Sequence, residues 1–176
     1  MDILPVLKTG KLIVLYAPHA ACEESMHLIA ELGLHGPVSI LDGGNRYKPY
    51  QVAMLIRRKT VEVHSVANRL HSRRAFTCYE MNTLLASIPA MQQPYVVLDL
   101  LNTFYDDHVP PHEVRRLLDS CLKQLERLLL SAPVVVTLAP PLVVERTFLL
   151  ELVCKKADEI LVKEEPICQV VQPALF

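Results

Sequence analysis

The sequence predicts an α/β domain in which helices cover both faces of a doubly wound, mostly parallel sheet. Short apolar runs rich in β-branched residues recur along the chain, and their hydrophobicity is continuous rather than alternating. Such runs are typical of strands that are buried on both faces, as in parallel sheets. Helical patterns separate the runs, and alternation of strand and helix at this spacing is the pattern of a doubly wound sheet.

The predicted elements alternate along almost the whole chain. The strands are expected at residues 12–16, 38–41, 75–78, 95–98, 134–138 and 159–163, and the helices at 22–33, 48–59, 61–70, 80–88, 111–130 and 145–156. Helix 111–130 has the clearest pattern, because its apolar residues recur at intervals of three and four and form one continuous face.

Length and composition predict one cytoplasmic domain over residues 1–176, with a core at about 7–165 and a C-terminal extension at about 166–176. No apolar run approaches the ~18 residues of a membrane span, and the first residues lack the features of a signal peptide. The five cysteines, at positions 22, 78, 121, 154 and 168, form no C-x-x-C pair. We therefore expect no disulfide framework, no metal site, no cofactor and no membrane contact.

A candidate site follows from the predicted topology, because the carboxyl ends of parallel strands share one edge. On that edge we expect residues 17–22, 42–45, 99–103 and 139–141. The first of these segments joins a strand to a helix, as nucleotide-binding loops do. Such loops bind phosphates through glycine backbone amides and a lysine. Here the loop Ala17–Ala21 has neither glycine nor lysine, and the helix begins with Cys22, Glu23 and Glu24.

Five segments, in the same order and spacing, resemble the ATPase core of the RecA/RadA recombinases over roughly residues 7–165. The first resembles the family's Thr-Gly turn and the strand before the Walker A loop. The second resembles its second strand and the start of the helix that follows. The other three resemble its Arg-Ala-aromatic strand, its Walker B strand and the start of its final strand. The corresponding residues are 9–17, 40–49, 74–77, 96–99 and 157–160.

Carried across residue by residue, the resemblance shows a degenerate Walker A motif. Its first glycine falls on Ala17, its second on Cys22, its lysine on Glu23 and its hydroxyl on Glu24. The water-activating glutamate falls on Gly44, whereas the Walker B aspartate persists as Asp99. The resemblance thus implies a vestigial nucleotide site without ATP hydrolysis, comprising Ala17, Pro18, His19, Ala20, Ala21, Cys22, Glu23, Glu24, Ser25, Asp42, Gly44 and Asp99.

Nucleic-acid contact is expected at a different place from that used by recombinases. Their DNA-binding loops correspond to residues 102–108, which are acidic here, and 139–144, which are uncharged. Residues 46–74, however, include eight basic residues and a single acidic one. The candidate contacts are Arg57, Arg58, Lys59, Arg69, Arg73 and Arg74. We expect them at the sheet edge opposite the nucleotide site; the alternative is a solvated surface that only confers solubility.

These observations favour a non-catalytic RecA-like domain. By the resemblance, it would act as an accessory or paralogue protein in DNA repair or recombination, through a protein partner such as a recombinase or a second copy, and through weak DNA binding at most. One alternative is a P-loop protein that still binds nucleotide. Another is a thiol enzyme using Cys22, which opens a helix three residues after His19. A magnesium ion held by Asp42 and Asp99 is less favoured, because no phosphate loop completes its coordination.

Overall fold

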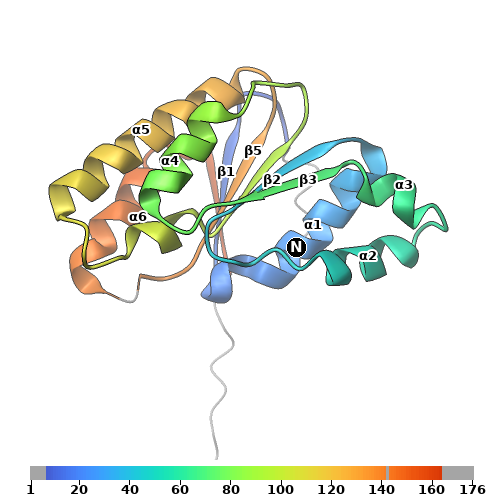
Figure 1. Ribbon diagram of the computed structural model, residues 1–176, viewed down its shortest axis with the longest axis horizontal. Coiled ribbons are helices and arrows are strands. Elements are labelled where there is room, and N and C mark those ends of the chain that lie inside the picture. The colour runs from blue at the N-terminus through green and yellow to red at the C-terminus, as the bar shows by residue number, and fades with distance from the viewer. Residues whose placement is uncertain (1–6, 142, 164–176) are drawn as a thin grey trace, which may run out of the picture.

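The chain folds around one six-stranded sheet in which every strand pair is parallel (Figure 1). The computed structural model describes residues 7–141 and 143–163, so the expected C-terminal extension and Cys168 lie outside the described residues. The strand order is β3-β2-β4-β5-β1-β6. Their bounds are β1 Leu12–Tyr16, β2 Val38–Asp42, β3 Leu70–Arg74, β4 Tyr95–Leu98, β5 Val134–Leu138 and β6 Glu159–Val162.

Three helices pack on each face of the sheet, which confirms the predicted α/β architecture. Helices α1 (Cys22–His35), α2 (Pro49–Arg57) and α3 (Val63–Ala67) cover one face, and α4 (Cys78–Ser87), α5 (Pro111–Leu129) and α6 (Thr147–Cys154) cover the other (Figure 1). Short 3-10 turns lie at Pro18–Ala21, Leu100–Phe104 and Val144–Arg146. Among the described residues, no helix is long and apolar enough to cross a membrane.

The sheet separates two hydrophobic cores because successive residues of a strand point to opposite faces. Leu12 and Val14 pack with α4, α5 and α6, whereas Ile13 and Leu15 pack with α1, α2 and α3. The central strands are therefore apolar on both faces, and this explains the continuous apolar runs on which the prediction of their positions rests.

The predicted position of the third strand is wrong, and the helix predicted at 61–70 is shorter, since α3 spans Val63–Ala67. The apolar run at residues 75–78 suggested a strand, but β3 is the polar segment Leu70–Arg74, paired with β2 from Val38 to Asp42. It lies at the edge of the sheet, and four of its five residues are exposed. An edge strand with little cover needs no apolar run. Residues 75–78 instead carry the chain into α4, whose first turn Thr77 caps by accepting a hydrogen bond from the Glu80 backbone N–H.

Candidate functional site

The loop after β1 turns sharply without a glycine. His19, Ala20 and Ala21 have φ angles of 54°, 54° and 49°, in the left-handed region, which costs roughly 1–2 kcal/mol for each such residue. The small side chains of Ala20 and Ala21 are buried, so packing holds this conformation. Two N–H groups of the loop are already engaged: that of Ala17 donates to the Leu138 carbonyl and that of Ala20 to the Ala17 carbonyl, each at 3.1 Å.

The two glutamates at the start of α1 have different surroundings. Glu24 forms an ion pair with Lys163, which follows β6 directly. Burial alone would raise the pKa of Glu24, but the hydrogen bond and charge of Lys163, with a backbone hydrogen bond, lower it below its ordinary value. Glu23 is exposed. Both carboxylates favour the positive end of the helix dipole. Glu24 thus joins the start of α1 to the end of β6.

Asp42 ends β2 and is almost completely buried, with 1% of its surface exposed. Its carboxylate accepts hydrogen bonds from the backbone N–H groups of Arg46 (2.9 Å) and Tyr47 (3.1 Å). The same carboxylate accepts from Arg74 Nε at 3.2 Å and forms an ion pair with Arg74 Nη2 at 3.1 Å. Asp42 therefore shapes the loop after β2, and four hydrogen-bond donors already surround its carboxylate.

Asp99 follows β4 and is equally buried. Its N–H donates to Thr137 Oγ1 on β5 at 2.8 Å, and its Oδ2 accepts from Arg46 Nε at 2.8 Å. Its Oδ1 has no hydrogen-bond partner among the described residues. Burial raises the pKa of the Asp99 carboxyl, and the hydrogen bond and charge of Arg46 oppose that shift. Arg46 thus supplies the counter-charge that makes this buried carboxylate tolerable.

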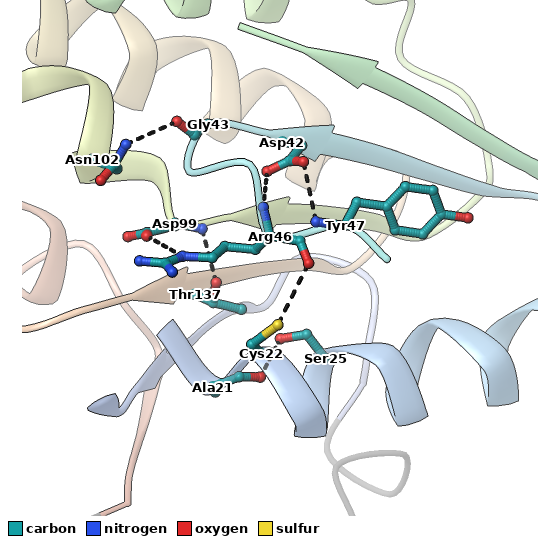
Figure 2. A network of polar contacts seen from close by, with 10 residues as sticks. All are labelled: Ala21, Cys22, Ser25, Asp42, Gly43, Arg46, Tyr47, Asp99, Asn102 and Thr137. Atoms are coloured by element: carbon teal, nitrogen blue, oxygen red, sulfur yellow. Dashed lines mark hydrogen bonds and ion pairs between the residues drawn. The ribbon is translucent and has the colours of Figure 1, made fainter. Parts of the chain in front are cut away.

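Arg46 joins three of the segments that meet at this edge (Figure 2). Its backbone N–H binds Asp42, its guanidinium binds Asp99, and its carbonyl oxygen accepts a hydrogen bond from the Cys22 thiol at 3.5 Å. The sequence analysis counts Arg46 among the basic residues at 46–74 but does not predict its role at the site. Its position four residues after Asp42, across a Gly-Gly turn, is the sequence signal for that role.

Gly44 lies directly against Asp99. A Cβ atom at position 44 would come within 2.5 Å of both Asp99 Cβ and Asp99 Oδ2, closer than such atoms approach one another. The neighbouring Gly43 donates its N–H to the Leu98 carbonyl at 2.8 Å, and its own carbonyl accepts a hydrogen bond from the Asn102 side chain at 3.5 Å. The position that the resemblance aligns with a glutamate therefore has no room for a side chain unless Asp99 moves.

The structure brings most of the predicted site residues to one edge of the sheet, while leaving them in separate contacts. The loop 17–21, Cys22, Asp42, Gly44 and Asp99 lie around the ends of β1, β2 and β4. Ser25 is buried, and its hydroxyl donates to the Ala21 carbonyl at 2.7 Å, within the same turn. Among the described residues, no cluster of three or more histidine, cysteine or acidic side chains is suited to hold a metal ion.

The structure places some of the basic residues at the carboxyl ends of the strands and others at the amino ends. This corrects the prediction, which put all of them opposite the candidate site. Arg57, Arg58 and Lys59 lie at the end of α2, and Arg69 just before β3, so these four are at the opposite edge as expected. Arg73 and Arg74 instead end β3, on the same edge as the candidate site.

Several members of this basic group also have partners within the chain. Arg74 binds Asp42, Lys59 forms an ion pair with Glu31, and Arg69 Nη1 donates to the Leu34 carbonyl at 3.5 Å. Arg57, Arg58 and Arg73 are exposed.

The acidic loop at 102–108 is held by a buried arginine. Arg146, only 5% exposed, donates from Nη2 to the carbonyl oxygens of Asp106 (3.1 Å) and Val109 (2.8 Å). The Asp106 carboxylate accepts hydrogen bonds from the backbone and the ring of His108, which lowers the pKa of Asp106. The acidic character of the loop persists in the structure. The second loop includes residue 142, which lies outside the described residues.

No protein-family model matches the sequence, and a search of curated proteins found no match.

Proposed function

We propose that this chain is a nucleotide-independent, non-catalytic RecA-like domain that acts through contact with a protein partner. The observation that carries the proposal is the internal pairing of the two carboxylates at the carboxyl edge of the sheet. Asp42 is bound by Arg74 and two backbone N–H groups, and Asp99 is bound by Arg46. In a working nucleotide site, carboxylates at this edge face a metal ion and phosphates.

Three further features support the exclusion of a nucleoside triphosphate. Glu23 and Glu24 bring negative charge to the helix start where phosphates would bind. At position 44, which aligns with the glutamate that activates water, a side chain would collide with Asp99. The Cys22–Arg46 hydrogen bond fixes the loop after β2 against the start of α1. Glu24, Gly44 and Cys22 thus each contact other groups of the protein at positions where the resemblance expects parts of the phosphate-binding site.

The biological role comes from the resemblance alone. Recombinase cores act in DNA repair and recombination, and a core that has lost its ATPase residues fits an accessory or paralogue role there. The partner is a recombinase, another repair protein or a second copy of the chain, and DNA binding adds at most a weak contribution.

Thermal unfolding with and without millimolar Mg-ATP tests the central claim. We expect an unchanged melting temperature, whereas saturation at a hundred times the dissociation constant would add about 2.7 kcal/mol and raise it by several degrees. The variant Glu23→Lys with Glu24→Thr restores the charge pattern of a Walker A helix and serves as a matched comparison. We expect no ATP effect in it either, because Arg46 and Gly44 still close the site. A clear rise in the unmodified chain would refute the proposal.

The DNA contribution is tested by gel shift at about 50 and 150 mM salt. A working basic surface predicts sequence-independent binding that weakens as salt rises, by about 0.9 in the log–log slope for each phosphate neutralised. The informative variant replaces the exposed Arg57, Arg58 and Arg73 by glutamate. Arg74 is left intact because it binds the buried Asp42. If the unmodified chain shifts neither single-stranded nor duplex DNA at the lower salt, the DNA half of the proposal is wrong.

A further inference from the structure

Helix α2 carries one apolar stripe that packs against the core and a second stripe, apolar except for Arg57, that does not. Val52 and Ile56 are buried beneath the helix. Tyr50, Ala53, Met54 and Arg57 follow the spacing i, i+3, i+4, i+7 and form a second face. A surface helix of a globular protein normally has a single apolar stripe. The second stripe of α2 therefore needs a separate explanation.

The second stripe lines a groove between α2 and α3. The α2–α3 groove has a cavity volume of about 480 Å³, and its lining includes Tyr50, Met54, Arg57, Val61, Val63 and His64. Three of its apolar side chains are open to solvent: Tyr50 is 79% exposed, Met54 42% and Val61 93%. They gather on one surface formed by a short stretch of chain, whereas isolated exposed apolar residues are normal and need no explanation.

The residue types in the groove are those that dominate protein–protein interfaces. Tyrosine, methionine and arginine are enriched at such interfaces, and tyrosine and arginine are also frequent among the few residues that carry most of the binding energy. Methionine in particular adapts its flexible side chain to different partners. Tyr50, Met54 and Arg57 stand side by side on one helical face.

The exposed charges beside the groove are positive on balance. Arg57 lines the groove, the exposed Arg58 follows it in the chain, and Lys59 is paired with Glu31. One exposed carboxylate, that of Glu62, lies between the lining residues Val61 and Val63. An apolar floor beside two exposed arginines is complementary to a segment that combines apolar and acidic side chains.

We propose that the α2–α3 groove binds an acidic segment of a partner protein. Its apolar side chains enter the groove beside Tyr50, Met54 and Val61, while its carboxylates face Arg57 and Arg58. This inference rests on the proposed function and specifies the chemistry of the protein contact.

Two other occupants are disfavoured by the same residues. A second copy docked through a two-fold axis would bring the same patch of both copies together, and each patch carries the exposed Arg57 and Arg58 against the single exposed Glu62, so the two patches would repel. A nucleic acid would leave the exposed Met54 and Val61 without a matching partner, since nucleic-acid grooves combine basic residues with several stacking aromatic rings and Tyr50 is the one phenylalanine, tyrosine or tryptophan among the lining residues.

Selection from a library of displayed random peptides of about 15 residues, panned against the full chain, tests the proposal. We expect enrichment of sequences that combine aspartate or glutamate with apolar residues. An enriched peptide, synthesised with a fluorophore, should lose about 30-fold in affinity for Tyr50→Ala and a similar factor for Arg57→Glu. Its binding should also weaken as salt rises. Tyr79→Ala, an exposed tyrosine on α4, is the matched control and should leave the affinity unchanged.

Five results would overturn the proposal. Three concern the peptides: the absence of any enriched family, enrichment of basic peptides, and enriched peptides that bind Tyr50→Ala as tightly as the unmodified chain. The fourth is self-association that Met54→Glu abolishes, which would assign the groove to a second copy. The fifth is displacement of the labelled peptide by a single-stranded oligonucleotide at about 150 mM salt, which would assign the groove to nucleic acid. Because Tyr50 and Arg57 are exposed, unchanged melting temperatures verify that these variants fold. The ATP titration is independent of this test, so either proposal can fail alone.

Discussion

The carboxyl edge of the sheet and the α2–α3 groove differ in whether their side chains already have partners within the chain. At the edge, Asp42 and Asp99 are buried and their charges are matched by arginines of the same chain. In the groove, Tyr50 and Val61 are apolar and exposed. Buried, paired charges stabilise one arrangement of the protein and leave little for a ligand to gain. Exposed apolar side chains gain free energy when a partner covers them. The comparison favours a structural role for the edge and supports the proposed binding role of the groove.

The largest expected effect is the loss of stability in Asp42→Ala. The substitution leaves the backbone N–H groups of Arg46 and Tyr47 without their acceptor and removes the partner of Arg74. Hydrogen bonds to a charged group contribute roughly 1.5–3 kcal/mol each, so we expect a loss of about 3 kcal/mol, or a melting temperature lower by roughly 6–12 °C.

Arg74→Ala is the control for that variant. The Arg74 side chain is 38% exposed, and removing it leaves both backbone hydrogen bonds to Asp42 in place. We expect a loss of about 1 kcal/mol or less, measured by the same urea or thermal unfolding. Equal effects of the two substitutions would mean that the Asp42–Arg74 ion pair, rather than the loop, provides the stability of this edge.

A smaller effect is expected from Gly44→Ala, since the added methyl group would collide with Asp99. Overpacking at such a site costs roughly 1–3 kcal/mol, and Asp99 would have to move away from Arg46. Gly36→Ala is the matched control because no atom lies within 4 Å of a Cβ added there. Its effect should stay within about 0.5 kcal/mol. If Gly44→Ala is as stable as Gly36→Ala in chemical denaturation, the edge is more open than its contacts indicate.

The strands of the sheet were predictable where burial on both faces dictates an apolar run. β1, β4 and β5 are enclosed by helices and by neighbouring strands, and their positions agree with the sequence pattern. β3 was not predictable in this way. Among the described strands it pairs with β2 alone, and most of its side chains are exposed. Its sequence, Leu-His-Ser-Arg-Arg, therefore forms no apolar run.

The residues of the candidate site were predictable, but their partners were not. Parallel topology alone brings Asp42 and Asp99 to one edge, and the alternation of strands and helices predicts that topology. The arginine that each aspartate binds depends on the path of the loop after β2 and on the register of β3. Arg74 reaches Asp42 because the two residues are opposite one another in the β2–β3 ladder. A strand misplaced by five residues conceals that pairing.

The smallest expected effect concerns Glu24, the most accessible of the three ion-paired carboxylates at this edge. Its pKa is lowered from 4.5 in the folded chain, with Lys163 opposing the effect of burial. A carboxyl group whose folded pKa is depressed contributes stability above its unfolded pKa and loses that contribution as the pH falls through the folded value.

Glu24→Gln should therefore lower the free energy of unfolding at about pH 7 by less than 1 kcal/mol. The difference should shrink as the pH falls through the lowered pKa of Glu24, below which both chains lack the charge. Glu23→Gln, in the same helical turn but exposed, is the control and should have a smaller effect at neutral pH. A difference for Glu24→Gln that stays constant with pH would show that its side chain acts through packing, and the edge would then depend less on internal charge pairing than the comparison requires.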